Sequence, residues 1–240
     1  MQVRVLLFGA LREVAASCTP LNLPDGTTAG DLLAALAAQH PAVAAMQASL
    51  ALAVNQEYVR RDTVLRDGDE VALLPPVSGG GVAGSTPVTG SDGVRVVLQR
   101  EPIATQALIR EIAAPADGAV LTFEGVVRDN SRGRRTLYLD YEAYEPMAQN
   151  EMQKLAAAAM ERFAVRSIAI VHRIGRLEIG EASVCIVVAS AHRGAAYEAS
   201  RFLIDTLKRT VPIWKREHFE DGAVWVDGEP FPPEIQGHKK

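Results

Sequence analysis

Cysteine is scarce in this 240-residue chain, which contains only Cys18 and Cys185. Two distant cysteines cannot form a disulfide scaffold or a cysteine-rich metal site. Their scarcity fits a reducing compartment, so we expect a cytoplasmic protein. The N-terminal stretch MQVRVLLFGALREV alternates apolar and polar residues, which is not the pattern of a secretory signal peptide.

Long apolar runs and an excess of one charge are also missing. No run approaches the about eighteen apolar residues that cross a bilayer, and the nearest is the alanine-rich stretch from Leu32 to Ala38. The formal net charge of −4 gives no general attraction to nucleic acid or to an acidic membrane. We therefore expect neither partner, and any anion site must come from local clusters of lysine and arginine.

The common catalytic and metal-binding motifs are absent as well. There is no H-E-x-x-H pattern, and the five histidines are scattered, which gives no plausible zinc spacing. No G-x-S-x-G turn marks a nucleophilic serine. The stretch GGGVAG is not followed by the lysine and hydroxyl residue of a phosphate-binding loop. We expect no metal and no tightly bound cofactor.

One unusual stretch, LLPPVSGGGVAG, runs from Leu73 to Gly84. Pro75 and Pro76 hold an extended path and donate no backbone hydrogen bond, whereas the three glycines that follow carry no side chain. Such a segment can be threaded into a narrow pocket. Composition alone equally describes a flexible linker between domains, so the rest of the chain must decide.

The residues before the glycines predict a small α+β domain. Val3 to Phe8 alternate as in a strand, and Thr28 to Gln39 predict a helix in which Thr28 and Asp31 are spaced as a capping box. Further short strands are separated by turn residues, which gives the order β-β-α-β-β. One helix across a mixed sheet is the β-grasp arrangement.

The stretch GGGVAGSTPVTGSDG, residues 79–93, has almost no core-forming residues and marks a domain boundary. Beyond it we expect a second α+β domain. The expected strands are GAVLTFEGVVR, LYLDYEAY, SIAIVHRIG and ASVCIVVASA, and the expected helices are AQNEMQKLAAAAMERF and AAYEASRFLIDTLKRT. Pro212 ends the second helix, because proline lacks the backbone donor that a further turn needs.

Cations cluster in this second domain. His192 and Arg193 lie between a strand and a helix, where free backbone N–H groups favour an anion. Arg201 and Lys208 are two helical turns apart and share a helix face, and Lys215 follows soon after. Arg128 follows another strand in the same way. These residues predict a pocket for a phosphate or carboxylate, although solvated surface cations remain the alternative.

Two further groups are interpreted as structural. His172 and Arg173, at the end of an expected strand, more often cap a turn than bind a ligand. Tyr138, Tyr141 and Tyr144 are interpreted as strand packing and not as a platform for stacking nucleic-acid bases.

The quoted motifs resemble those of a known family. FGALRE and DGDEVALLPPVSGG resemble the small sulfur-carrier subunit of molybdopterin synthase, and TFEGVVRDNSRG, LDYEAYEPMA, VHRIG, SAHRGAAYEA and LKRTVPIWKRE resemble its large catalytic subunit. The resemblance implies a fusion of two subunits with an α+β fold. It implies a β-grasp, ubiquitin-like carrier domain over residues 1–80, a flexible linker over 81–93 and an α/β hammerhead-type catalytic domain over 94–240.

The resemblance also implies a function and a site. In the family, the last glycine of the carrier becomes a thiocarboxylate and delivers sulfur to cyclic pyranopterin monophosphate. An activating enzyme adenylates and sulfurates the carrier, and catalytic subunits pair as a homodimer, here expected through the second domain. The matching residues are Gly79 and Gly80 for the carrier end, Lys208 and Lys215 for catalysis, and Arg128, His192, Arg193 and Arg216 for substrate contact.

In this chain Gly80 is followed by Gly81 in peptide linkage, so no free carboxylate exists to be activated. We expect a cut after Gly80, because a slack stretch of small residues is accessible to proteases. The alternative is an uncut, ubiquitin-like docking module that occupies the catalytic pocket and keeps it inactive.

Overall fold

The computed structural model describes residues 1–13, 20–77, 88–89, 93–226, 228, 231–232 and 235. The chain forms two compact units: Met1–Ser78 together with Asp227–Lys240, and Gly79–Val226. The C-terminal stretch therefore belongs to the first unit, whereas the sequence suggested one domain from residue 94 onward. Cys18 and the glycines at 79, 80 and 81 lie outside the described residues.

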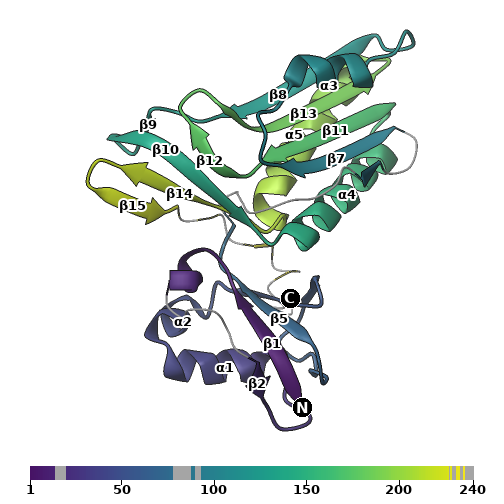
Figure 1. The fold of residues 1–240 in the computed structure, drawn as a ribbon. Coiled ribbons are helices and arrows are strands. Elements are labelled where there is room, and N and C mark those ends of the chain that lie inside the picture. The colour runs from purple at the N-terminus through teal and green to yellow at the C-terminus, as the bar shows by residue number, and fades with distance from the viewer. Residues whose placement is uncertain are drawn as a thin grey trace. The chain divides into compact units, whose positions relative to one another are not determined.

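The first unit is built on a five-stranded sheet in the order β2-β1-β5-β3-β4. Its strands are β1 (Gln2–Leu7), β2 (Leu21–Asn22), β3 (Ala51–Val54), β4 (Glu57–Val59) and β5 (Glu70–Leu74). Its helices are the 3-10 helix η1 (Gly9–Glu13), α1 (Ala29–Gln39) and α2 (Pro41–Met46). β1 and β5 pair in parallel and the other pairs are antiparallel, so the expected β-grasp order is confirmed (Figure 1).

The predicted capping box at the start of α1 is present. Asp31 N–H donates to Thr28 Oγ1 at 3.1 Å, and Thr28 N–H donates to Asp31 Oδ2 at 2.9 Å. The buried face of α1 carries Leu32, Leu33 and Leu36, which pack on one side of the sheet with β1, β3 and β5. These two local signals explain why the helix begins where the sequence indicates.

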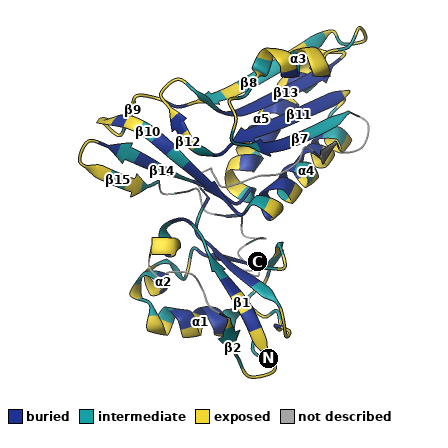
Figure 2. Cartoon of the chain, in the orientation of Figure 1, coloured by how far each residue is buried: buried dark blue, intermediate teal, exposed yellow. Residues whose placement is uncertain are grey.

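The second unit contains a five-stranded sheet in the order β6-β7-β11-β13-β8. The strands are β6 (Val88–Thr89), β7 (Val94–Gln99), β8 (Ala119–Val126), β11 (Ser167–Arg173) and β13 (Ala182–Ser190). β11 is buried along its whole length (Figure 2). Its Ile168 and Ile170 face one apolar cluster, and Ala169 and Val171 face another. Both faces of this sheet are therefore covered.

Helices supply the two covers. They are α3 (Thr105–Ile112), α4 (Glu145–Arg162) and α5 (Arg193–Thr210). Leu108 and Ile112 of α3 pack in the cluster on one face, whereas buried residues of α4 and α5 pack on the other face (Figure 1). Because successive side chains of a strand point to opposite faces, alternate residues of β11 pack under different helices.

A second five-stranded sheet, in the order β12-β10-β14-β15 with β9 paired to β10, completes this unit. Its strands are β9 (Asn130–Ser131), β10 (Arg134–Ala143), β12 (Gly175–Glu178), β14 (Ile213–Phe219) and β15 (Gly222–Trp225). β14 follows α5 directly, because Pro212 cannot continue the helix. In the antiparallel ladder, Tyr141 of β10 lies opposite Lys215 of β14.

The α+β class and the β-grasp first domain are confirmed. The expected helices of the second unit are present, with α4 beginning three residues and α5 two residues before the expected starts. Sequence reasoning missed the shorter elements, above all the β14–β15 hairpin. Among the described residues, no helix is both long enough and apolar enough to cross a bilayer.

The buried His172 generates a pH prediction. Its Nδ1 lies 2.9 Å from the Arg173 carbonyl oxygen, which can only accept, so Nδ1 carries the proton. Burial lowers the pKa of His172 to about 4, against about 6.5 in an unfolded chain. Between these values the unfolded state binds more protons, so acidification through this window destabilises the second unit. His172→Gln should lose that dependence, which is at most about 1.4 kcal/mol per pH unit.

Urea unfolding followed by tryptophan fluorescence measures this effect, since Trp214 and Trp225 both belong to the second unit. Burial raises the pKa of Glu145 to about 7, and this group adds an opposite slope in both proteins. The quantity to compare is therefore the free energy of unfolding. Its difference between wild type and His172→Gln is followed from pH 7 to 4.5. Equal slopes for the two proteins would show that His172 does not titrate as stated.

Candidate functional site

Two cationic side chains from separate elements act on a third, Lys215, in the second unit. Lys208 lies in the last turn of α5, Lys215 lies in β14, and Arg128 follows β8. The side chain of Lys215 is only 27% exposed, whereas Lys208 and Arg128 are exposed. Burial lowers the pKa of Lys215, and the charges of Lys208 and Arg128 lower it further. The structure thus brings three of the sequence-predicted residues together.

Glu217 opposes this depression of the Lys215 pKa. Its Oε1 lies 3.8 Å from Lys215 Nζ, and its side chain is 10% exposed. The two residues share a face of β14, because alternate residues of a strand point the same way. The carboxylate therefore favours the charged form of an ammonium group that burial would otherwise tend to neutralise. Sequence reasoning did not single out Glu217, although the i, i+2 spacing in IWKREHF is the signal that finds it.

A buried tyrosine lies opposite Lys215 in the strand ladder. Tyr141, directly opposite Lys215 in the ladder, is buried, and burial raises the pKa of its hydroxyl while a hydrogen bond with Ser183 lowers it. The ring of Tyr141 meets the ring of His172 edge-on, with centroids 5.6 Å apart. Lys215 therefore lies beside a buried tyrosine in the ladder, and that tyrosine packs against the buried His172.

Arg216 lies on the opposite face of β14 from Lys215 and Glu217. It is opposite Asp140 of β10, and its guanidinium carbon is 5.8 Å from the centre of the Trp225 ring. On the same face, Tyr138 stacks on His218 with ring centroids 4.1 Å apart. The structure therefore separates Arg216 from the cluster of Lys208, Lys215 and Arg128, and the tyrosine expected to pack on its strand does so.

His192 and Arg193 are exposed at the other end of α5. His192 is the residue before the helix, and its carbonyl accepts a hydrogen bond of 2.7 Å from Ser190 Oγ. Fifteen residues separate Arg193 from Lys208, which is about 22 Å along a helix that rises about 1.5 Å per residue. An arginine and a lysine reaching toward each other do not close that gap, so within one chain they cannot hold the same anion.

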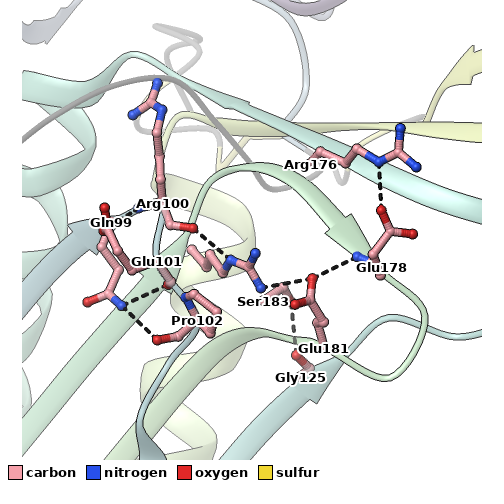
Figure 3. Close-up of polar contacts among 10 residues, drawn as sticks. Gln99, Arg100, Glu101, Pro102, Gly125, Arg176, Glu178, Glu181 and Ser183 are labelled. Carbon is pink, nitrogen blue, oxygen red and sulfur yellow. Dashed lines mark hydrogen bonds and ion pairs between the residues drawn. The ribbon is translucent and has the colours of Figure 1, made fainter.

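Arg173 has a structural role in this unit through Arg100 and Glu181, both of which are labelled in Figure 3. Its Nε donates to the Arg100 carbonyl oxygen at 2.9 Å, and its Nη1 lies 2.9 Å from Glu181 Oε2. The guanidinium of Arg173 lowers the pKa of Glu181. Because this arginine is buried and paired, it ties the ends of β7 and β11 to the loop before β13. Together with the burial of His172, this agrees with the structural interpretation of both residues.

The two predicted carrier residues cannot be placed in the structure. Gly79 and Gly80 lie outside the described residues. In the described part of the chain, no group of three or more histidine, cysteine, aspartate or glutamate residues could hold a metal ion. The cluster of Lys208, Lys215 and Arg128 can place two ammonium groups and a guanidinium near a developing negative charge, which is the requirement for stabilising an anionic transition state.

Comparisons with known proteins match the two units to two families. The sequence model of the ThiS family matches residues 5–80, and that of the MoaE protein matches residues 98–210. The first range includes Gly79 and Gly80, and the second includes Arg128, His192, Arg193 and Lys208. Lys215 and Glu217 lie beyond the second range.

Two individual relatives are molybdopterin synthase catalytic subunits. The molybdopterin synthase catalytic subunit of Halalkalibacterium halodurans is 46% identical over 132 residues, which cover 55% of this chain and 85% of that protein. The human molybdopterin synthase catalytic subunit is 41% identical over 125 residues, which cover 52% of this chain and 66% of that protein. A crystal structure of molybdopterin synthase from Staphylococcus aureus superposes with a TM-score of 0.52 and 40% identity, and covers 54% of this chain and 94% of that chain.

The Lys215–Glu217 pair generates a prediction that requires no substrate. In Glu217→Gln the carboxylate that raises the pKa of Lys215 is gone, so the pKa should fall and the amine should become reactive at a lower pH. Competitive acetylation across a pH series, read by mass spectrometry, measures this shift. Lys154 on α4, which is paired with Glu151 at 2.9 Å, serves as the internal control. Unchanged reactivity of Lys215 would show that Glu217 does not set its protonation.

Proposed function

The chain belongs to the family of molybdopterin synthase catalytic subunits and carries a ThiS-family domain ahead of that region, and from this premise we propose that it transfers sulfur from its own N-terminal domain to cyclic pyranopterin monophosphate. Its role lies in molybdenum cofactor biosynthesis, as an enzyme of molybdopterin formation. The observation that carries the proposal is the partly buried Lys215, held between Glu217 and the cations Lys208 and Arg128.

The proposed sulfur donor is Gly80, after the chain has been cut behind it. A cut exposes a carboxylate, which an activating enzyme can adenylate and convert to a thiocarboxylate. The two prolines at 75 and 76 direct the tail, and glycines at its end present the smallest possible cross-section. This domain order places donor and acceptor sites in one gene product, so carrier and catalytic unit are made in equal amounts.

The proposed transfer proceeds in two steps. The thiocarboxylate sulfur attacks a side-chain carbon of the pterin, a carbon–sulfur bond forms, and the bond from that carbon to its leaving oxygen breaks. The leaving oxygen takes the electron pair and a proton. Water then hydrolyses the acyl–sulfur bond, which leaves sulfur on the substrate and a carboxylate on Gly80. A second round with a newly formed thiocarboxylate on Gly80 repeats the steps to complete the dithiolene.

Each cation has a role in this chemistry. Lys208 is the proposed donor of the proton to the leaving oxygen, since its ammonium group is exposed to solvent. Lys215 is the proposed stabiliser of charge on the carbonyl of the acyl intermediate. A fixed donor of this kind typically contributes about a hundred- to a thousandfold in rate. Arg128 would hold the cyclic phosphate, because guanidinium groups bind phosphate oxygens in a fork.

We further propose that two copies of the chain pair and complete each other's sites. His192 and Arg193 match substrate-contacting positions, yet they lie about 22 Å from Lys208 along α5. In a two-fold dimer the start of α5 from one copy can be placed beside the end of α5 from the other. Each substrate would then be held by Lys208, Lys215 and Arg128 of one copy and by His192 and Arg193 of its partner.

Mixed variants test this arrangement. Lys208→Ala and Arg193→Ala should each abolish molybdopterin formation when expressed alone in cells that lack their own synthase subunits. Co-expressed, the two variants form mixed dimers in which one site has both residues intact, so about a quarter of wild-type activity should return, because half of random dimers are mixed and half of their sites are whole.

The double variant, with both changes in one chain, is the matched control and should stay inactive when co-expressed with either single variant. Failure of the two single variants to restore any activity, although both are soluble and dimeric, would contradict sharing of the site between copies. A monomer by light scattering at micromolar concentration would contradict the dimer itself.

A further inference from the structure

The C-terminal stretch of the chain returns to the first unit. Asp227–Lys240 groups with Met1–Ser78 and not with the catalytic unit that precedes it in sequence. The chain therefore passes between the two units twice, once near residue 78 and once near residue 226. A cut after Gly80 breaks only the first of these connections. The contacts of residues 227–240 then decide whether the carrier unit stays attached.

Among the described residues of this stretch, Phe231 makes a buried apolar contact. Its side chain is 2% exposed, and its ring meets the Tyr58 ring edge-on, with centroids 5.7 Å apart and an interplanar angle of 64°. Edge-to-face packing at this separation is a favoured arrangement of aromatic rings. Phe231 is therefore anchored to β4 of the carrier unit.

The face of the carrier sheet that holds this contact is the one turned away from α1. Tyr58 is paired with Ala53 across β3 and β4, and Ala53 is paired with Ala72 across β3 and β5. Directly paired residues share a face, and the neighbours Leu52 and Leu73 belong to the cluster under α1. The face with Tyr58, Ala53 and Ala72 is thus a second apolar face, and its small side chains leave room for an aromatic ring.

Gly228 fixes the same stretch to the base of the glycine tail. A β-carbon on Gly228 would lie 2.3 Å from the carbonyl carbon and oxygen of Pro76 and from the carbonyl oxygen of Val77. Only a residue without a side chain allows so close an approach. Pro76 and Val77 immediately precede the segment that carries Gly80, so this contact is made at the point where the tail leaves the carrier unit.

We propose that Gly228 and Phe231 form a C-terminal clasp, by which the end of the catalytic chain holds the sulfur-carrier unit after the connection at residues 78–80 is cut. The clasp turns a cut carrier into a retained subunit and holds the base of its tail. The role of the clasp in retaining a cleaved carrier rests on the proposed cut behind Gly80. The contacts of Gly228 and Phe231 with the carrier unit do not depend on that cut. A carrier that is a separate chain can dissociate and be replaced by another. A carrier held by the clasp would be converted to the thiocarboxylate again while it stays bound to its catalytic unit.

The test replaces residues 81–87 of the full chain, which precede β6, with the recognition sequence of a site-specific protease and cuts the purified protein there. Dilution followed by native mass spectrometry gives the concentration at which the two fragments separate. Phe231→Ala should raise that concentration about ten- to a hundredfold, because a fully buried phenylalanine ring is lost from the interface. Gly228→Ala should act in the same direction.

Matched controls separate the clasp from general damage. Tyr197→Ala removes an aromatic ring that is 62% exposed, and Gly194→Ala adds a methyl group where nothing lies within 4 Å. Neither should move the separation point. The engineered cut requires no thiocarboxylate and no natural protease, so a failure of the sulfur-transfer proposal leaves this result interpretable.

Two outcomes would overturn the clasp. Separation of wild type and Phe231→Ala at the same concentration would show that the C-terminal stretch does not hold the carrier. Unfolding of the first unit in the uncut Phe231→Ala protein, measured by amide hydrogen exchange over β1 and β5, would show that Phe231 is part of the domain core and not a contact with a folded carrier.

Discussion

A partly buried ammonium group near two other cations is an unfavourable arrangement, and Glu217 offsets part of that cost. Burial and the charges of Lys208 and Arg128 all lower the pKa of Lys215, and the Glu217 carboxylate 3.8 Å away opposes them. The β10–β14 ladder places Tyr141 opposite Lys215, and the i, i+2 spacing of Lys215 and Glu217 puts both side chains on one face of β14. The site therefore depends on the register of one strand pair, since a slip of one residue would exchange Lys215 for Arg216 on that face.

Two long-range features shape how such a site would be used. The length of α5 separates His192 and Arg193 from Lys208 by about 22 Å, which is why the proposed site is shared between two copies. The return of the C-terminal stretch to the carrier unit, through Phe231 and Gly228, gives that unit a second connection. Together they describe a fused protein in which a covalent join sets stoichiometry and non-covalent contacts keep the parts working together.

The sequence predicted those features that local patterns encode. The capping box at Thr28 and Asp31, the apolar face of α1 and the stop at Pro212 depend on neighbours within a few residues, so they were found. Glu217 and the opposite orientation of Arg216 were missed, because β14 follows a proline break and its short alternating pattern contains four charged or polar residues between Trp214 and Phe219. Phe231 was missed because its partner Tyr58 is distant in sequence and no local pattern marks such a contact.

If Gly80 carries sulfur after the chain is cut behind it, the intact mass of the purified protein will show both the cut and the sulfur. The protein should be purified from cells that express the molybdenum cofactor pathway and analysed without reduction or denaturing hydrolysis. We expect a fragment that ends at Gly80, with a mass that shows sulfur in place of one oxygen, together with a fragment that begins at Gly81. Full-length chain alone, in cells that make molybdopterin with this protein as their only synthase, would contradict it.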